Sequence, residues 1–174
     1  MIVVVAGVAG SGKTTVGQLL AARRGWTFTD ADSFHPPANV AKMRAGLPLT
    51  DADREPWLAA ITSWMDDIIA SGQSAVLACS ALKRRYREEL LSGRAQAEMV
   101  FLVISREQDA ARLSARTGHF FDPPLMASQF ADLELPTDEP RVHRVPVGDR
   151  PPGQVAAEIV RLLGLETAGR PQAS

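Results

Sequence analysis

A glycine-rich segment near the start of the chain has the residue types and the spacing that bind phosphate. It reads GVAGSGKTT, residues 7–15, and directly follows the apolar run MIVVVA. The pattern Gly-x-x-x-x-Gly-Lys-Thr surrounds phosphate oxygens with backbone N–H groups, while the lysine reaches the β- and γ-phosphates and the hydroxyl binds Mg²⁺. We therefore predict a nucleoside triphosphate site, with Lys13 on the terminal phosphates and Thr14 as a metal ligand. The predicted nucleotide-binding residues are Gly7, Val8, Ala9, Gly10, Ser11, Gly12, Lys13, Thr14 and Thr15.

Other motifs narrow the class of nucleotide-binding protein. A GTPase is expected to carry an Asn-Lys-x-Asp motif for guanine, whereas Asn39, the only asparagine in the sequence, is followed by Val40. A motor-type ATPase normally needs a longer chain than 174 residues. Kinases remain, and in a kinase a second set of residues must hold the acceptor.

Two aspartates are candidates for that second set. Asp30 and Asp32 lie in FTDADSFHP, residues 28–36, just after an expected strand. The carboxyl end of such a strand is where ligands bind in parallel sheets, and in an extended segment two side chains spaced by two point in a similar direction. Two carboxylates are compatible with a polyphosphate if one faces Mg²⁺ and the other faces a hydroxyl. The alternative is an acidic turn in which Asp32 caps a helix.

The elements that must position these residues alternate along the chain. Apolar runs without strict alternation predict strands covered on both faces, at 2–5, 26–29, 75–79, 99–104 and 142–147. Helical spacing of apolar residues predicts helices at 13–24, 51–70 and 154–163, the second with Thr50 and Asp53 as a capping box. This order predicts an α/β fold, a parallel sheet with helices on both sides.

Composition and charge limit the class of protein further. With 45% hydrophobic residues, the chain can bury the core of one domain, which we place at 1–165, with a tail at 166–174. The net charge of −1 indicates neither nucleic acid nor a membrane surface as a partner. The single cysteine, Cys79, cannot form an internal disulfide. We expect no targeting segment, no membrane span and a cytoplasmic location.

Four segments together resemble the gluconokinase family of small ATP-dependent kinases. Besides the glycine-rich loop they are DADSFHPPANVAKMRAGLPLTDADREPWL, CSALKRRYRE and GHFFDPPLMASQF. The resemblance implies ATP and Mg²⁺ as cofactors, D-gluconate as the acceptor, and 6-phospho-D-gluconate and ADP as products. It also implies a three-layer P-loop kinase fold with a five-stranded parallel sheet, an acceptor-binding helical insertion at about 36–70, a lid at about 116–127, and a homodimer.

Within this resemblance the two aspartates receive separate roles. Asp32 is expected to accept a hydrogen bond, and then the proton, from the 6-hydroxyl of gluconate. Asp30 is expected to hold Mg²⁺ through water, because the strand that ends in VLAC continues into Ser80 and supplies no separate aspartate. The two roles could be exchanged.

The carboxylate of gluconate calls for a basic clamp, which arginine or lysine supplies. We expect Lys83, which closes CSALK and shares a helix face with Arg87, to be the main clamp residue. Arg54 is the second candidate, and it lies with Arg44 in the long acceptor segment. The remaining substrate and phosphate candidates are His35, the lid residue His119, and the lid arginines Arg112 and Arg116, which the resemblance implies close over the triphosphate. Each basic residue could instead belong to a solvated helix face, and Trp57 is expected in the core.

Two other functions fit parts of the pattern. A shikimate kinase shares the loop and the paired aspartates but needs a different clamp. A non-catalytic ATP-responsive protein binds ATP without acceptor-dependent turnover. The last expected strand, RVHRVPVGDRPP, has Pro146 and Gly148 where an aspartate and an adenine-lining loop were expected, so the adenine contacts stay unassigned.

Overall fold

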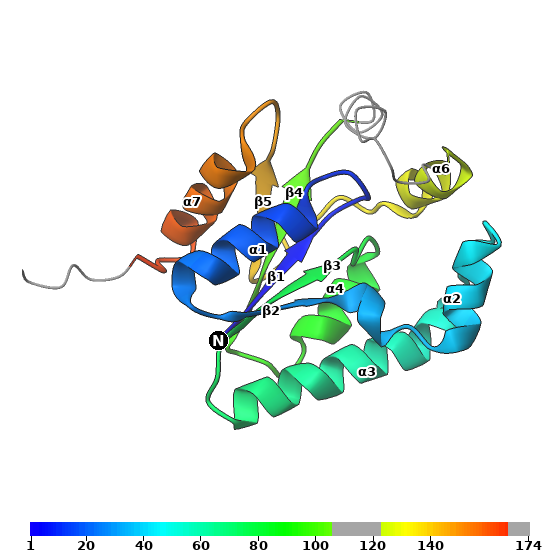
Figure 1. Ribbon diagram of the computed structural model, residues 1–174, viewed down its shortest axis with the longest axis horizontal. Coiled ribbons are helices and arrows are strands. Elements are labelled where there is room, and N and C mark those ends of the chain that lie inside the picture. The colour runs from blue at the N-terminus through cyan, green and yellow to red at the C-terminus, as the bar shows by residue number, and fades with distance from the viewer. Residues whose placement is uncertain (106–122, 167–174) are drawn as a thin grey trace, which may run out of the picture.

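The computed structural model describes residues 1–105 and 123–166. Within these residues five parallel strands form one sheet in the order β2-β3-β1-β4-β5 (Figure 1). The strands are β1 Ile2–Ala6, β2 Thr27–Asp30, β3 Ala75–Cys79, β4 Ala97–Val103 and β5 Val142–Pro146. The predicted α/β fold with a five-stranded parallel sheet is confirmed.

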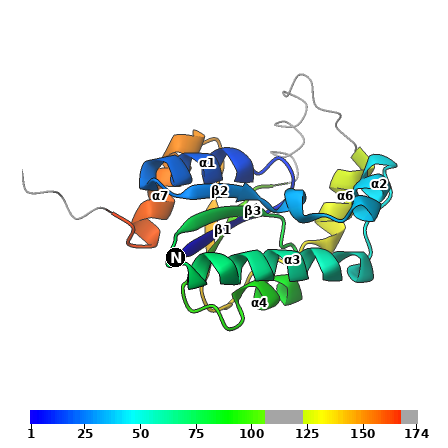
Figure 2. The same cartoon turned by 60° about the horizontal axis from the view of Figure 1, so that its bottom comes forward.

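Helices cover both faces of this sheet (Figure 1). Helices α1 (Lys13–Arg24) and α7 (Pro152–Leu162) pack together on one face, and α3 (Asp51–Ala70) and α4 (Arg84–Leu91) cover the other. Helices α2 (Pro37–Arg44) and α6 (Pro123–Asp132) both lie beyond the carboxyl ends of the strands (Figures 1 and 2). A short 3₁₀ helix, η1 (Ala31–Phe34), leads from β2 toward α2. The carboxyl edge of the sheet is therefore enclosed by helices on two sides.

The core explains why the apolar runs become central strands. All five residues of β1 and of β3 are buried, so both faces of these strands are covered. Val16 and Leu20 of α1 and Ile61 and Met65 of α3 are buried against the sheet at helical spacing. No helix in the two described ranges is long and apolar enough to cross a membrane.

Helix α3 begins at a capping box, as predicted. The Thr50 hydroxyl accepts from the Asp53 N–H at 3.2 Å, and the Asp53 carboxylate accepts from the Thr50 N–H at 2.8 Å. Both groups satisfy N–H donors that a helix start leaves without partners. The cap fixes where the first turns of α3 begin and therefore where Arg54 and Trp57 lie at the carboxyl edge.

The segment around the two aspartates differs from the extended conformation that we predicted. The Asp30 carboxylate accepts from the Asp32 N–H at 3.1 Å, and the chain turns into η1 at Ala31. An aspartate at this position favours such a turn because its side chain can bond the backbone two residues on. Asp30, rather than Asp32, is the capping residue. Most of the predicted lid, 116–127, and nearly all of the tail lie outside the described residues.

Candidate active site

The glycine-rich loop joins β1 to α1 in close contact with the sheet. Gly7 has φ +141°, and a Cβ built on it would lie 2.8 Å from the carbonyl oxygen of Leu102, so a side chain does not fit there. Gly12 also has a positive φ, +94°, and its carbonyl accepts the first helical hydrogen bond of α1. The Lys13 ammonium turns back over the loop and donates to the carbonyl of Val8 at 2.8 Å. This is the fold of a phosphate-binding loop at a helix start.

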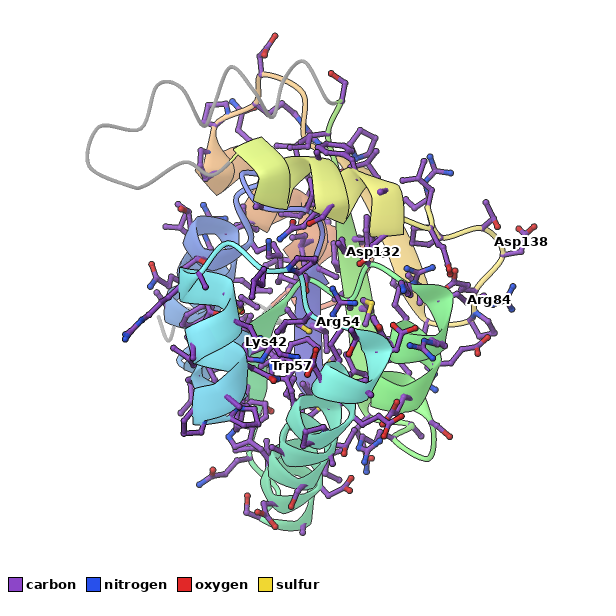
Figure 3. The ribbon with its side chains drawn as sticks, turned by 90° about the vertical axis from the view of Figure 1, so that its right-hand side faces the viewer. Lys42, Arg54, Trp57, Arg84, Asp132 and Asp138 are labelled. Carbon is purple, nitrogen blue, oxygen red and sulfur yellow. The ribbon has the colours of Figure 1, made fainter. Side chains whose placement is uncertain are left out.

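A cavity of about 340 Å³ opens beside this loop at the carboxyl edge of the sheet. Its walls come from the phosphate loop, the end of β2, the α2–α3 region and α6. The lining residues able to act on a ligand include Lys13, Thr14, Asp30, Asp32, His35 and Arg54. Figure 3 shows Arg54 and Trp57 pointing inward between these elements. The volume is in the range of small-molecule sites.

One pair of oxygen ligands stands at the loop side of the cavity. The Thr14 hydroxyl donates to Asp30 Oδ2 at 3.2 Å, while the other oxygen of Asp30 holds the η1 turn. Hydroxyl and carboxylate oxygens are the hard donors that Mg²⁺ prefers, and it commonly takes only one or two from protein. The residues present therefore fit the metal that a nucleoside triphosphate carries.

Asp32 stands within the cavity, close to the phosphate loop. Its carboxylate lines the cavity together with Lys13, Asp30 and His35. Burial among these walls raises the pKa of Asp32 above 3.8, the nearby Asp30 carboxylate raises it further, and His35 and Lys13 oppose both effects. A carboxylate with a raised pKa is a better proton acceptor than an ordinary one.

His35 and Trp57 form a stacked pair in the wall of the cavity, beside Asp32. Their ring centroids are 4.7 Å apart with planes inclined by 7°, and the indole N–H donates to the carbonyl of Ala31 at 2.7 Å. Burial lowers the pKa of His35 below 6.5, although Asp32 acts in the opposite direction. Trp57 is 3% exposed, which agrees with the expected core position, but it also lines the cavity.

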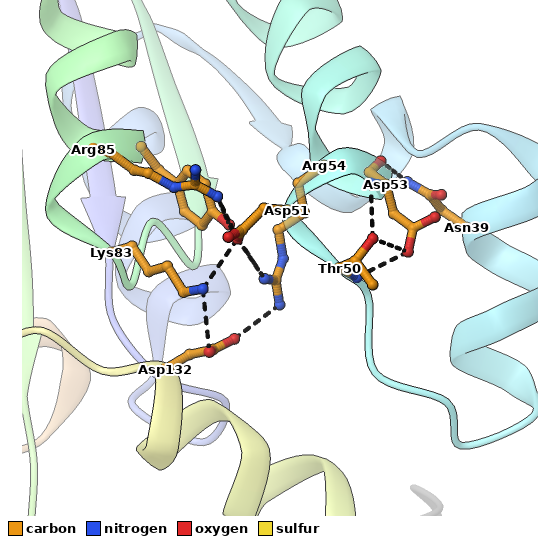
Figure 4. Close-up of polar contacts among 9 residues, drawn as sticks. Asn39, Thr50, Asp51, Asp53, Arg54, Lys83, Arg85 and Asp132 are labelled. Atoms are coloured by element: carbon orange, nitrogen blue, oxygen red, sulfur yellow. Dashed lines mark hydrogen bonds and ion pairs between the residues drawn. The ribbon is translucent and has the colours of Figure 1, made fainter.

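An ionic cluster lies just outside this wall (Figure 4). We call it the Asp51–Asp132 cluster, after the two carboxylates that hold its cations. Asp51 is paired with Lys83 at 3.0 Å and with Arg54 at 3.7 Å, and it also contacts Arg85 and the Tyr86 hydroxyl. Asp132, at the end of α6, is paired with Arg54 at 3.1 Å and with Lys83 at 3.4 Å. The hydrogen bond from Tyr86, and then that from Lys83, hold the pKa of Asp51 far below its usual range.

Arg54 is the member of this cluster that reaches the cavity. Its guanidinium donates to the Tyr86 hydroxyl at 3.2 Å and to Asp132 at 3.1 Å, and its side chain is 20% exposed. A guanidinium has five N–H donors, and these two hydrogen bonds use two of them. Arg54 therefore brings a positive charge to the wall of the cavity.

Other basic residues of the predicted clamp are not brought to the cavity. Lys83 lies behind Arg54, and its ammonium is paired with Asp51 and Asp132. The hydrogen bond to Asp51 and the charge of Asp132 raise the pKa of Lys83. Arg44 is exposed at the end of α2 and does not line the cavity. Lys83 therefore pairs with the same two carboxylates as Arg54 but does not line the cavity.

The prediction for Arg87 is wrong. Its side chain is 1% exposed, forms two hydrogen bonds to the carboxylate of Glu139 at 2.6 and 2.7 Å, and donates to the carbonyls of Ala81 and Leu82. Helical spacing placed it beside Lys83, but the turn of α4 directs it into the protein toward Glu139. Arg87 is therefore a buried structural residue that joins distant segments.

Three site residues were not predicted from the sequence. Gln129 of α6 accepts from the N–H of Ala9 in the phosphate loop at 2.6 Å, and Asp132 holds Arg54 from the same helix. Asn39 of α2 is 3% exposed and contacts His35. Asn39 and Gln129 lie inside two of the segments that carry the family resemblance, but neither was singled out there, and Asp132 lies outside all four segments. The predicted residues Arg112, Arg116 and His119 lie outside the described residues.

Comparison with known proteins places this chain among kinases. The shikimate kinase family model matches residues 9–163. A gluconokinase from Gluconobacter oxydans (strain 621H) is 49% identical over 158 residues, which cover 91% of this chain and 88% of the relative. The solved gluconokinase from Sinorhizobium meliloti 1021 superposes with a TM-score of 0.80 at 40% identity, covering 95% of this chain and 96% of that chain. Shikimate kinase from Acinetobacter baumannii in complex with shikimate shares the fold, with a TM-score of 0.57 at 18% identity over 97% of this chain and 95% of that chain.

Proposed function

The chain belongs to the gluconokinase family, and on that premise we propose how its residues carry out the reaction. The enzyme is an ATP-dependent carbohydrate kinase whose acceptor is gluconate. The γ-phosphoryl group of ATP passes to the 6-hydroxyl of D-gluconate, which gives 6-phospho-D-gluconate and ADP.

The observation that supports these roles is the order of groups around one cavity. The phosphate loop with Lys13 lies at one side, Asp32 stands next to it, and Arg54 lies in the wall formed by α3. Gluconate carries its carboxylate at the end of the chain opposite the 6-hydroxyl. A carboxylate bound by Arg54 therefore directs the hydroxyl toward Asp32 and the terminal phosphate.

Phosphoryl transfer needs positioning and compensation of charge more than covalent chemistry. Asp32 accepts the proton of the 6-hydroxyl as the new O–P bond forms and the bond from phosphorus to ADP breaks. The raised pKa of Asp32 suits this role, because general-base catalysis is most effective when the base is well matched to its working pH. Lys13 and the loop N–H groups stabilise the negative charge on the transferring group. The arginines Arg112 and Arg116 are proposed to add to this effect.

The kinase family implies ATP, and we propose Mg²⁺ as its companion. Thr14 and Asp30 are the residues that would hold the metal, directly or through water, since they present adjacent oxygens beside the loop. When bound, the metal neutralises part of the charge of the β- and γ-phosphates. A homodimer in the cytoplasm completes the proposal, and light scattering of the purified protein tests the dimer.

An acceptor panel tests the proposed reaction. ADP release is measured with Mg·ATP and gluconate, shikimate or no acceptor, and the product is examined by ³¹P and ¹H NMR. We expect stimulation by gluconate only, with phosphorus coupled to the protons on C6. Stimulation by shikimate, or phosphate on another hydroxyl, would contradict the assignment. Equal ADP release in all three reactions would support the non-catalytic alternative.

A further inference from the structure

We propose that Asn39 is a positioning residue that holds His35 as the neutral Nε2–H tautomer, so that His35 and Asp32 together hold one acceptor hydroxyl. The identity of that acceptor rests on the proposed function. The tautomer itself does not, because it is a property of the protein without substrate.

The orientation of the Asn39 carboxamide is determined by a backbone carbonyl. Asn39 is 3% exposed, and its Nδ2 donates to the carbonyl oxygen of Asp53 at 2.7 Å. That carbonyl belongs to the first turns of α3, whose start the capping box fixes. The opposite orientation would place the amide oxygen against a carbonyl oxygen, two acceptors without a hydrogen between them. Nδ2, a donor, therefore faces both Asp53 and His35.

This orientation decides which ring nitrogen of His35 carries the proton. The second N–H of the Asn39 amide faces His35 Nδ1, with the nitrogens 3.4 Å apart. Nδ1 must then be the acceptor, and a neutral imidazole whose Nδ1 accepts carries its hydrogen on Nε2. The ring cannot turn away readily, because it is stacked on Trp57 and its side chain is only 6% exposed.

The other side of the ring faces the reacting end of the cavity. His35 Nε2 lies 3.9 Å from Asp32 Oδ1, which is too far for a direct hydrogen bond. A hydroxyl oxygen at about 2.8 Å from each atom would bridge them, since such lengths are normal for hydrogen bonds. That hydroxyl donates its proton to Asp32 and accepts from the Nε2–H of His35. Its second lone pair stays available for the phosphorus atom.

The reverse tautomer would act against the chemistry. Without its hydrogen, Nε2 would be a second acceptor and would compete with Asp32 for the hydroxyl proton. A hydroxyl that donated to Nε2 would no longer direct its lone pair at the phosphorus atom. Arg54 and Asp32 are the charged groups that influence His35 across the cavity. Asn39 thus acts on the hydroxyl through His35, without touching the substrate.

The wild-type protein labelled with ¹⁵N-histidine tests the tautomer directly. Long-range ¹H–¹⁵N correlation spectra distinguish a bare ring nitrogen from a protonated one. We expect a bare Nδ1 and a protonated Nε2 for His35, identified by loss of its signals in His35→Gln. A protonated Nδ1 with a bare Nε2 overturns the proposal, and so does an even mixture of tautomers.

An Asn39→Asp variant tests whether Asn39 is the cause. A carboxylate accepts from Nδ1, so the proton should appear on Nδ1 of His35. His143, whose Nε2 contacts Glu98 at 2.9 Å in the β4–β5 pair, reports on any general disturbance in the same spectrum and should not change. We expect kcat/KM for gluconate to fall about tenfold, the value of one misplaced hydrogen bond, with ATP affinity unchanged. An unchanged His35 tautomer in a folded variant overturns the proposal.

Addition of gluconate to the wild-type protein tests the bridged hydroxyl. The Nε2 signal of His35 should shift on binding while the signals of His143 stay in place. If gluconate is turned over but the His35 signal does not move, the hydroxyl contact is wrong. If no acceptor is phosphorylated, the proposed function fails, and the tautomer measured without substrate still decides the role of Asn39.

Discussion

Replacement of Arg54 by glutamine removes the charge that we assign to the gluconate carboxylate while keeping a polar side chain that can still donate a hydrogen bond. In the structure the Arg54 side chain is 20% exposed, and its guanidinium is held by Asp132 and Tyr86, so the side chain is both oriented and partly withdrawn from water. A hydrogen bond to a charged group contributes about 1.5–3 kcal/mol. A forked contact makes two such hydrogen bonds. Because the Arg54 side chain is partly exposed to solvent, we expect the two bonds together to contribute about as much as one. The expected loss in kcat/KM for gluconate is therefore about 10- to 150-fold.

The assay is steady-state ADP release with two acceptors that differ at one end. D-Glucitol has the same carbon chain as gluconate with an alcohol in place of the carboxylate. The Arg54→Gln enzyme should lose activity with gluconate mainly through a higher KM, because the carboxylate is bound equally in the ground and transition states. Its activity with D-glucitol should equal that of the wild type, since that acceptor has no carboxylate to lose.

The matched control is Arg85→Gln. Arg85 also contacts Asp51 in the Asp51–Asp132 cluster, but its side chain is 54% exposed and it does not line the cavity. This variant should keep the gluconate KM within about twofold, because exposed ion pairs contribute little. Equal losses for gluconate and D-glucitol in Arg54→Gln would refute the clamp and indicate a general effect on the cavity.

Three further predictions test other parts of the structure. Arg87→Gln should lower the free energy of unfolding by about 3 kcal/mol, because it breaks a buried ion pair, and it should leave the gluconate KM unchanged, because that pair lies outside the cavity. Thermal denaturation checks the stability, and steady-state kinetics check the KM. Lys42 and the Thr50 cap lower the pKa of Asp53 from 3.8 to about 2. This carboxylate therefore stabilises the fold above pH about 4, and the stabilisation is lost as the pH falls toward 2. Urea titrations across this range should show a loss of stability that Asp53→Asn lacks. Chelation should abolish turnover, added Mg²⁺ should restore it, and Thr14→Ala should need more Mg²⁺ for half-maximal rate, whereas an unchanged requirement would contradict the role of the hydroxyl.

The sequence predicted the elements well because their signals are local. The α1 and α3 helices begin and end at the predicted residues, and the Thr50 capping box is formed as expected. Strand ends were shifted by up to two residues, as for β4, which begins at Ala97. The phosphate loop was readable because backbone geometry, lysine and hydroxyl all come from one short segment.

The wall of the cavity was harder to predict because its contacts join distant segments. Arg87 and Glu139 are 52 residues apart, so helical spacing alone could not show that this arginine is buried. Asp132 belongs to no motif, and Gln129 lies in GHFFDPPLMASQF without a role of its own there; both reach the site because α6 lies over the carboxyl edge (Figures 1 and 2). Lys83 was expected to be the main clamp residue, but its ammonium is paired with Asp51 and Asp132, and Arg54 rather than Lys83 lines the cavity.

The measurement that tests the account most directly is gluconate-dependent ADP release by Asp32→Asn, with ATP binding followed in parallel by calorimetry. The amide keeps the shape of the side chain but cannot accept the hydroxyl proton. We predict that kcat falls about 100-fold or more while the dissociation constant for ATP stays close to that of the wild type. Turnover near the wild-type rate would contradict the assignment of Asp32 and, with it, the proposed geometry of transfer.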